Sequence, residues 1–124
     1  MPAVHHVAVV VSDLARAERF YSGVLGLTVL ERHTDDAGAP RSVWLALEGG
    51  AFLALERAGL SQPKRDEYAP GWHCVALAIT RGARASWRQH LADAGHAVER
   101  ETPYTLYVRD PDGALVALSH YPEK

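Results

Sequence analysis

The chain has 124 residues, of which 48% are hydrophobic and 23% are charged. This composition is typical of a folded globular domain and excludes a disordered or fibrous chain. The formal net charge is −2, so no excess of positive charge favours nucleic acid or an anionic membrane surface. We therefore expect the partner to be a small molecule or another protein.

The sequence predicts neither a targeting segment nor a membrane span. Residues 1–6 lack the charged and apolar stretches of a signal peptide, and the apolar run at residues 7–11 is too short to cross a bilayer. The single cysteine, Cys74, cannot form an internal disulfide. We expect a soluble, cytoplasmic protein.

The first half of the chain reads as a strand, a helix and three further strands. A strand-like segment over residues 5–11, which includes the β-branched run Val9–Val11, is followed by Ser12 or Asp13 as a helix cap and by Gly26 as the helix end. The apolar residues between them recur at helical spacing: Leu14, Ala17, Phe20, Tyr21, Val24 and Leu25. Strands are predicted at 28–32, 43–47 and 52–57, with a tight turn at Gly49-Gly50.

The second half repeats this order. His73-Cys-Val-Ala-Leu-Ala-Ile echoes His5-His-Val-Ala-Val-Val-Val, and a helical stripe then ends at Gly95. The stripe consists of Ala83, Trp87, Leu91 and Ala94. Strands are predicted at 97–100, 105–109 and 114–119, with Asp110-Pro-Asp-Gly113 as the last turn.

These patterns predict an α+β fold made of two βαβββ modules within one domain. Module one covers about 1–58, an exposed linker or lid covers 59–71, and module two covers 72–124. The two modules are expected to form a cupped mixed β-sheet with the helices on the outside. The alternative is an ordinary α+β sandwich without a functional cavity.

Several motifs resemble the vicinal oxygen chelate superfamily, which comprises glyoxalases, bleomycin resistance proteins and dioxygenases. The resemblance covers nearly the whole chain, and its motifs are His5-His-Val-Ala-Val-Val-Val-Ser-Asp-Leu, Phe20-Tyr21, Val24-Leu-Gly-Leu27 and Asp110-Pro-Asp-Gly113. The superfamily includes metal-dependent enzymes and metal-free bleomycin-binding proteins, so the fold leaves the chemistry open.

The resemblance implies four metal-ligand positions, which fall on His6, Ala54, Cys74 and Ala117. Alanine offers no donor atom, and a catalytic zinc needs about three protein ligands. We therefore predict no metal and no cofactor. Glu56 faces the same way as residue 54 but lies about 6.6 Å farther along the strand, so it replaces the missing ligand poorly.

Strand alternation predicts which side chains line the cup. The expected inward residues are His6, Ala8 and Val10; Phe52, Ala54 and Glu56; Cys74, Ala76 and Ala78; and Leu115, Ala117 and Ser119. Trp44 and Tyr107 are expected to add aromatic walls, although Trp44 and Trp72 could equally be core or interface residues. The odd spacing of His5, His73 and His120 places them on the other face. From these positions we predict a ligand site made of His6, Trp44, Phe52, Ala54, Glu56, Cys74, Tyr107 and Ala117.

The favoured hypothesis is a metal-free protein that binds or sequesters a small, largely apolar compound. One alternative is a divergent metal-dependent lyase, isomerase or dioxygenase whose site is rebuilt from His6, Glu56 and Cys74, or which uses Glu56 as a base. Another is an interaction module whose cup is filled by its own side chains. From the resemblance alone, we also expect a homodimer.

Overall fold

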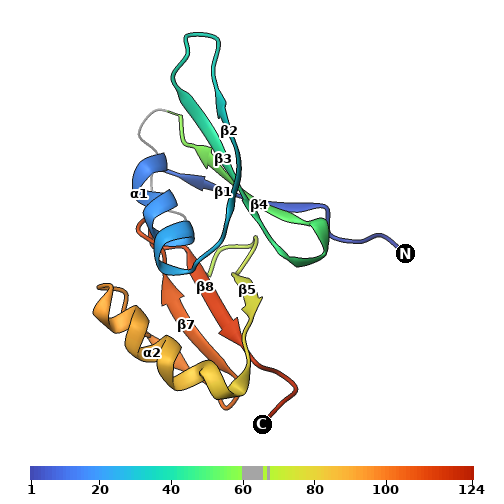
Figure 1. The fold of residues 1–124 in the computed structure, drawn as a ribbon, viewed down its shortest axis with the longest axis vertical. Helices are drawn as coiled ribbons and strands as arrows, with labels where there is room; N and C mark the ends of the chain where they lie inside the picture. The colour runs from blue at the N-terminus through green and yellow to red at the C-terminus, as the bar shows by residue number, and fades with distance from the viewer. Residues whose placement is uncertain (60–65, 67) are drawn as a thin grey trace. The chain divides into compact units, whose positions relative to one another are not determined.

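The computed structural model describes residues 1–59, 66 and 68–124, and its contacts divide the chain into two compact units, Met1–Pro63 and Lys64–Lys124. Each unit is a βαβββ module (Figure 1). The first contains β1 (His6–Val11), α1 (Leu14–Glu18), a π-helical segment (Arg19–Val24), β2 (Val29–Thr34), β3 (Pro40–Ala46), a short 3₁₀ helix (Glu48–Gly50) and β4 (Phe52–Arg57). The second contains β5 (Val75–Ala78), a 3₁₀ helix (Arg81–Ala83), α2 (Arg84–Asp93), β6 (Arg100–Glu101), β7 (Thr105–Arg109) and β8 (Leu115–Ser119). The predicted modular fold is confirmed.

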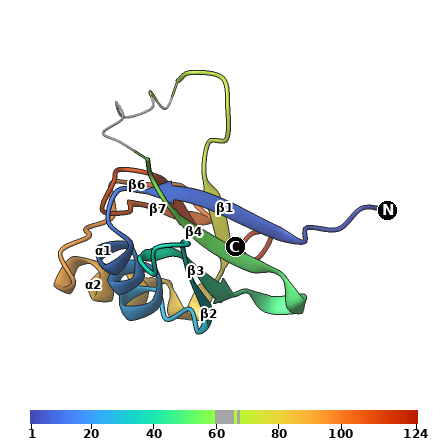
Figure 2. The same cartoon turned by 90° about the horizontal axis from the view of Figure 1, so that it is seen from above.

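The first sheet is mixed, with the strand order β1-β4-β3-β2. β1 runs parallel to β4, and Figure 2 shows the two strands side by side. β3 is antiparallel to both of its neighbours. Helix α1 contacts β3 and β4, and the side chains buried between them include Val43, Leu45, Leu53 and Leu55. Because strand side chains alternate, the even-numbered residues of β3 and β4 lie on the face away from α1.

The predicted first helix forms in two parts. The Asp13 side chain accepts a hydrogen bond from the backbone N–H of Arg16, as expected of a helix cap. Beyond Glu18 the hydrogen bonds widen to five residues, with the N–H of Leu25 donating to the carbonyl of Phe20 at 2.9 Å. In this wider turn both Phe20 and Tyr21 are buried. The departure from a regular helix thus coincides with the burial of two consecutive aromatic side chains.

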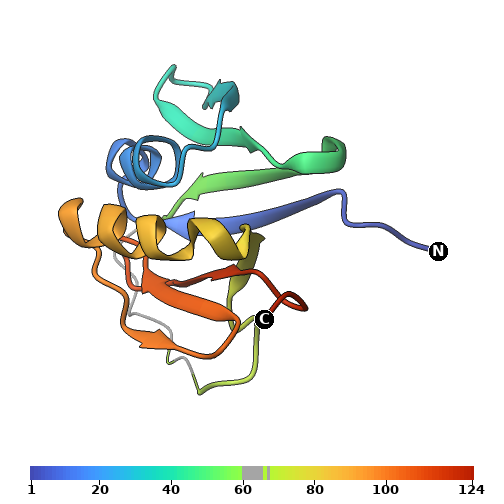
Figure 3. The same ribbon diagram turned by 60° about the horizontal axis from the view of Figure 1, so that its bottom comes forward.

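The second sheet repeats the arrangement, with the strand order β5-β8-β7-β6 and a parallel β5–β8 pair. Helix α2 buries Leu91 completely and lies over this sheet in Figure 3. The strand predicted at 97–100 is wrong in extent, since β6 covers only Arg100–Glu101. A tight turn joins β6 to β7, and in it the Thr102 N–H donates to the Thr105 carbonyl. The β6–β7 ladder therefore starts at the residues just before this turn, Arg100 and Glu101.

The predicted turn at Asp110 is confirmed, and an equivalent turn follows β2. Asp110 Oδ1 accepts hydrogen bonds from the N–H groups of Asp112 and Ala114, and Asp35 Oδ1 does the same for Ala37 and Ala39. The backbone N–H of Ala39 and the guanidinium of Arg57 lower the pKa of Asp35. Each turn therefore uses a buried or bonded carboxylate to satisfy its own backbone donors.

The predicted linker falls largely on residues 60–65 and 67, which lie outside the described residues, and so does its suggested role as a lid. Within the part of the chain that the structure describes, no helix has the length and apolar character needed to cross a membrane.

Candidate ligand-binding site

The register of the first sheet places the predicted inward residues of β1 beside those of β4. His6 lies opposite Phe52, Ala8 opposite Ala54, and Val10 opposite Glu56 on the parallel β1–β4 pair. Trp44 on β3 lies opposite Ala54 from the other side. All of these positions belong to the face that α1 does not cover. The alternation argument therefore places His6, Phe52, Ala54, Glu56 and Trp44 together on one sheet face.

A row of rings crosses this face, with one ring from each of the four strands. The His6 ring on β1 stacks on Phe52 of β4, with centroids 4.8 Å apart and planes 6° apart. Phe52 stacks on Trp44 of β3 at 4.4 Å and 22°, and Trp44 contacts His33 of β2 at 4.5 Å. The first three rings are nearly parallel and are spaced like neighbouring strands, so they stand upright from the sheet, whereas the His33 ring is tilted by 54° from Trp44. We call these four residues the ring row.

Two histidines of this region depart from the sequence analysis. His5 was expected on the opposite face, but its ring meets Phe52 edge-on at 5.7 Å and its Nδ1 lies 2.9 Å from Nδ1 of His6. The expectation was wrong because β1 begins at His6, so strand alternation does not govern residue 5. His33 was not predicted. It lies two residues after Glu31, the register partner of Trp44, so strand alternation places both residues on the same side of β2.

The second sheet carries the corresponding positions. Ala76 lies opposite Ala117, and Tyr107 lies opposite Ala117 on the other side. Tyr107 thus occupies in module two the place that Trp44 occupies in module one. Ala54 and Ala117 are each only 2% exposed. In both modules a buried alanine on the last strand therefore lies beside an aromatic residue of the preceding strand.

A cavity of about 320 Å³ opens around Tyr107, and it is lined by Tyr68, His73, Glu99, Arg100, Tyr107, Arg109 and Leu115. The Arg100 guanidinium lies 4.4 Å from the centre of the Tyr107 ring, a cation–π contact. Arg109 is paired with Glu99 at 2.6 Å. Sequence analysis missed both arginines, although Arg109 shares its strand face with Tyr107. The predicted residue Cys74 is half-buried and lies one residue before β5.

The donor set of the two sheets does not fit a catalytic metal ion. Ala54 and Ala117 provide no ligand atom at two of the four expected positions. His6 and Glu56 cannot share an ion, because their strand positions differ by four residues in register, about 13 Å at strand spacing. Over residues 1–59, 66 and 68–124, no three His, Cys, Asp or Glu side chains are grouped to hold a metal.

Comparison with known proteins gives a consistent picture. The family model described as "Glyoxalase/Bleomycin resistance protein/Dioxygenase superfamily" matches residues 3–118. A glyoxylase/bleomycin resistance protein/dioxygenase domain from Frankia sp. EAN1pec is 24% identical, with a TM-score of 0.79 over 97% of this chain and 98% of that chain. A glyoxalase/dioxygenase from Nostoc punctiforme is 20% identical, with a TM-score of 0.81 over 98% and 92%.

A further similar structure is the fosfomycin resistance protein FosX from Listeria monocytogenes, in complex with Mn(II). It is 15% identical, with a TM-score of 0.76 over 96% of this chain and 92% of that chain. At these identities the solved structures show the shared fold.

Proposed function

We propose that this chain, which belongs to the glyoxalase/bleomycin resistance protein/dioxygenase superfamily, binds a small, planar, largely apolar compound without a metal ion. The ring row on the first sheet is the observation that carries this proposal. Its residues come from four different strands, so the sheet fixes their spacing before any ligand arrives.

The ring row offers a surface suited to an aromatic ligand. His6 is exposed, whereas Phe52 and Trp44 are half-buried, so the rings keep part of their surface open. Because they stand upright, they present their edges to a molecule that lies across the row. Ring edges carry partial positive charge and favour the face of another π-system, and each such contact contributes about 0.5–1.5 kcal/mol beyond the burial of area.

The rest of this sheet face favours binding over metal chemistry. Ala8, Ala54 and Ala46 keep side-chain bulk small around the rings, and a mostly apolar surface with few polar groups is typical of small-molecule sites. Metal-bound relatives such as FosX show that the fold can hold an ion, but this chain has alanine where two ligands are expected. We therefore propose that this sheet face binds its ligand through the ring row and not through a metal ion.

The experiment is a thermal-shift screen of the full chain with planar aromatic compounds, including catechols and bleomycin-type ligands. A compound that binds only the native state raises Tm. Replacing Trp44 by leucine should abolish the shift in Tm. The control is Trp87→Leu, which should keep the shift, because Trp87 lies on α2 of the other unit and its described ring contact is with His90. A broad panel that leaves Tm unchanged, or equal losses in both variants, would refute the proposal.

Elemental analysis separates this proposal from the metal-dependent alternative. We expect untagged protein to hold no stoichiometric divalent metal after dialysis. Stoichiometric zinc, nickel, iron or manganese that survives dialysis would instead support a lyase, isomerase or dioxygenase.

A further inference from the structure

A second candidate site lies in module two, on the opposite face of its sheet. Arg100 pairs with Tyr107 and lines the cavity around it, whereas the next residue, Glu101, points towards α2. There the start of α2, the turn after β6 and the segment after β8 surround an open depression of about 820 Å³. Its lining residues are Arg81, Gly82, Arg84, Ala85, Arg88, Pro103, Tyr104, His120 and Lys124.

The charge of this depression contrasts with that of the chain. Four of its lining side chains are cations, and none of the described residues that line it is acidic, although the whole chain carries a formal charge of −2. A concentration of positive charge in a concave surface raises the local concentration of anions. We call this surface the basic depression.

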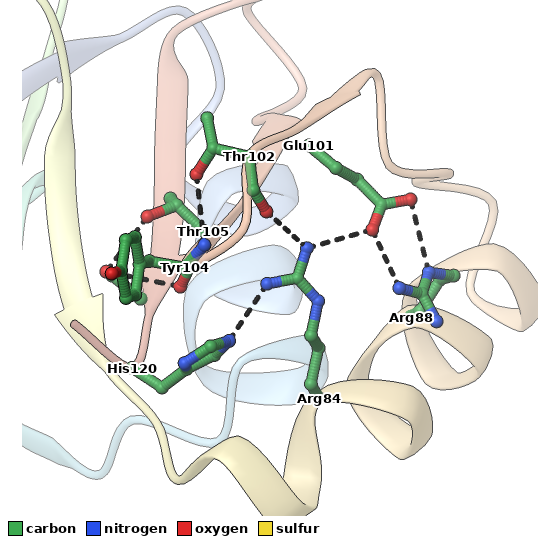
Figure 4. Close-up of polar contacts among 8 residues, drawn as sticks. Arg84, Arg88, Glu101, Thr102, Tyr104, Thr105 and His120 are labelled. Atoms are coloured by element: carbon green, nitrogen blue, oxygen red, sulfur yellow. Dashed lines mark hydrogen bonds and ion pairs between the residues drawn. The ribbon is translucent and has the colours of Figure 1, made fainter. Parts of the chain in front are cut away.

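Arg84 is held in a fixed orientation at its centre, as Figure 4 shows. Its guanidinium donates to Glu101 Oε1 at 3.0 Å, to the carbonyl of Thr102 at 2.7 Å, and to His120 Nε2 at 2.9 Å. His120 Nδ1 lies 2.5 Å from the carbonyl of Glu123 and must donate to it, so Nε2 is the acceptor for Arg84. In this tautomer, His120 is the third acceptor that holds the Arg84 guanidinium, besides Glu101 and the Thr102 carbonyl.

These contacts leave most of the positive charge available. Glu101 also binds Arg88, at 2.7 and 3.3 Å, so one carboxylate faces two guanidinium groups. Arg84 uses three of its five N–H donors and Arg88 uses two, by the contacts above. The side chains of Arg81 and Lys124 form no hydrogen bond or ion pair with any other residue that the structure describes. An ion pair that only held α2 against β6 would need Glu101 and a single arginine, so the other cations are not required for this contact.

We propose that the basic depression binds the phosphate or diphosphate group of a small molecule. Guanidinium forks match the oxygen geometry of phosphate, and Lys124 adds a mobile point charge. The orientation of Arg84 is set before binding, which reduces the entropic cost of ordering it. The volume of the depression is typical of a small-molecule site, and the negative charge of the chain disfavours a nucleic acid.

The test is calorimetric titration of the full chain in Tris chloride with inorganic phosphate and with pyrophosphate. Binding should weaken by at least about tenfold in Arg81→Gln and in Lys124→Gln, because each removes one charged donor. Neither side chain has a described partner, so both variants should keep the Tm of the parent chain. Added sodium chloride should weaken binding further.

The matched control is Arg41→Gln, which removes an exposed arginine of β3 in the other unit and should leave the affinity unchanged. The proposal is overturned if neither phosphate nor pyrophosphate binds, or if Arg41→Gln weakens binding as much as Arg81→Gln does. Tighter binding of a single-stranded oligonucleotide than of pyrophosphate would likewise overturn the assignment to small molecules. None of these outcomes depends on the ring row, so the two proposals fail separately.

Discussion

At the scale of single residues, Glu101 is a carboxylate that pairs with two guanidinium groups, those of Arg84 and Arg88. Hydrogen bonds from Arg88 and then Arg84 hold its pKa below the ordinary value of 4.5, and its presence raises the pKa of Arg88. A lowered pKa in the folded state means that the folded chain binds this proton less readily than the unfolded chain. Glu101 therefore stabilises the fold at neutral pH, and this contribution is lost as the pH falls below about 4.5.

We predict that Glu101→Gln lowers Tm at pH 7 and reduces the further loss of Tm between pH 5 and pH 3, because glutamine does not titrate. Thermal unfolding of both proteins across this pH range measures the effect. The control is Glu48→Gln, which changes an exposed glutamate with no described ion pair. Parallel pH curves for the parent chain and Glu101→Gln would contradict the prediction.

The same scale shows how far residue positions follow from the sequence. Alternation placed His6, Phe52 and Glu56 on one face because β1 and β4 are regular paired strands. It failed for His5, which lies before the first strand residue. His33 and Arg100 were missed because they lie on β2 and β6, whose bounds were misplaced and whose side chains were not assigned a face.

At the scale of elements, both module helices end at a glycine with positive φ. Gly26 has φ of +81° and Gly95 has φ of +84°, a conformation that costs other L-residues about 1–2 kcal/mol. A Cβ at Gly26 would meet no atom within 4 Å, so the backbone alone sets the requirement. This geometry explains why the sequence signal for the two helix ends is reliable.

We predict that Gly26→Ala lowers the free energy of unfolding by about 1–2 kcal/mol. The nearby Gly23→Ala should instead raise it by about 0.5–1 kcal/mol, because Gly23 lies inside the helical segment with no positive φ and no close neighbour. Urea denaturation of the two variants provides the comparison. Equal destabilisation would show that both glycines are required by packing rather than by φ.

At the scale of the whole molecule, the edge strand β1 provides an argument for association. Within the described residues of the first unit, β1 pairs with β4 alone, and Val7 and Val10 of this strand are exposed. An exposed apolar edge strand is a ready template for pairing with another chain. Together with family membership, it supports the proposal that the chain forms a homodimer through β1.

We predict a dimeric mass by sedimentation, and a shift to the monomer in Val10→Lys, because a charge on the edge opposes pairing. Leu30→Lys changes an exposed aliphatic residue of β2, the strand at the other edge of the same sheet, and should leave the mass unchanged. A monomeric parent chain would refute the prediction, and a monomeric Leu30→Lys would move the interface to β2.

The sequence by itself determined the order and type of the elements, the module repeat and the alanines at two expected ligand positions. The elements and their repeat follow from local properties: side-chain periodicity, capping residues and the φ values that only glycine adopts readily. The ligand positions follow from the family resemblance. Only the tertiary structure decided which rings from four strands stack, and how Arg84, Glu101 and His120 meet. Such contacts depend on strand register and on residues distant in sequence, which periodicity along one segment does not encode.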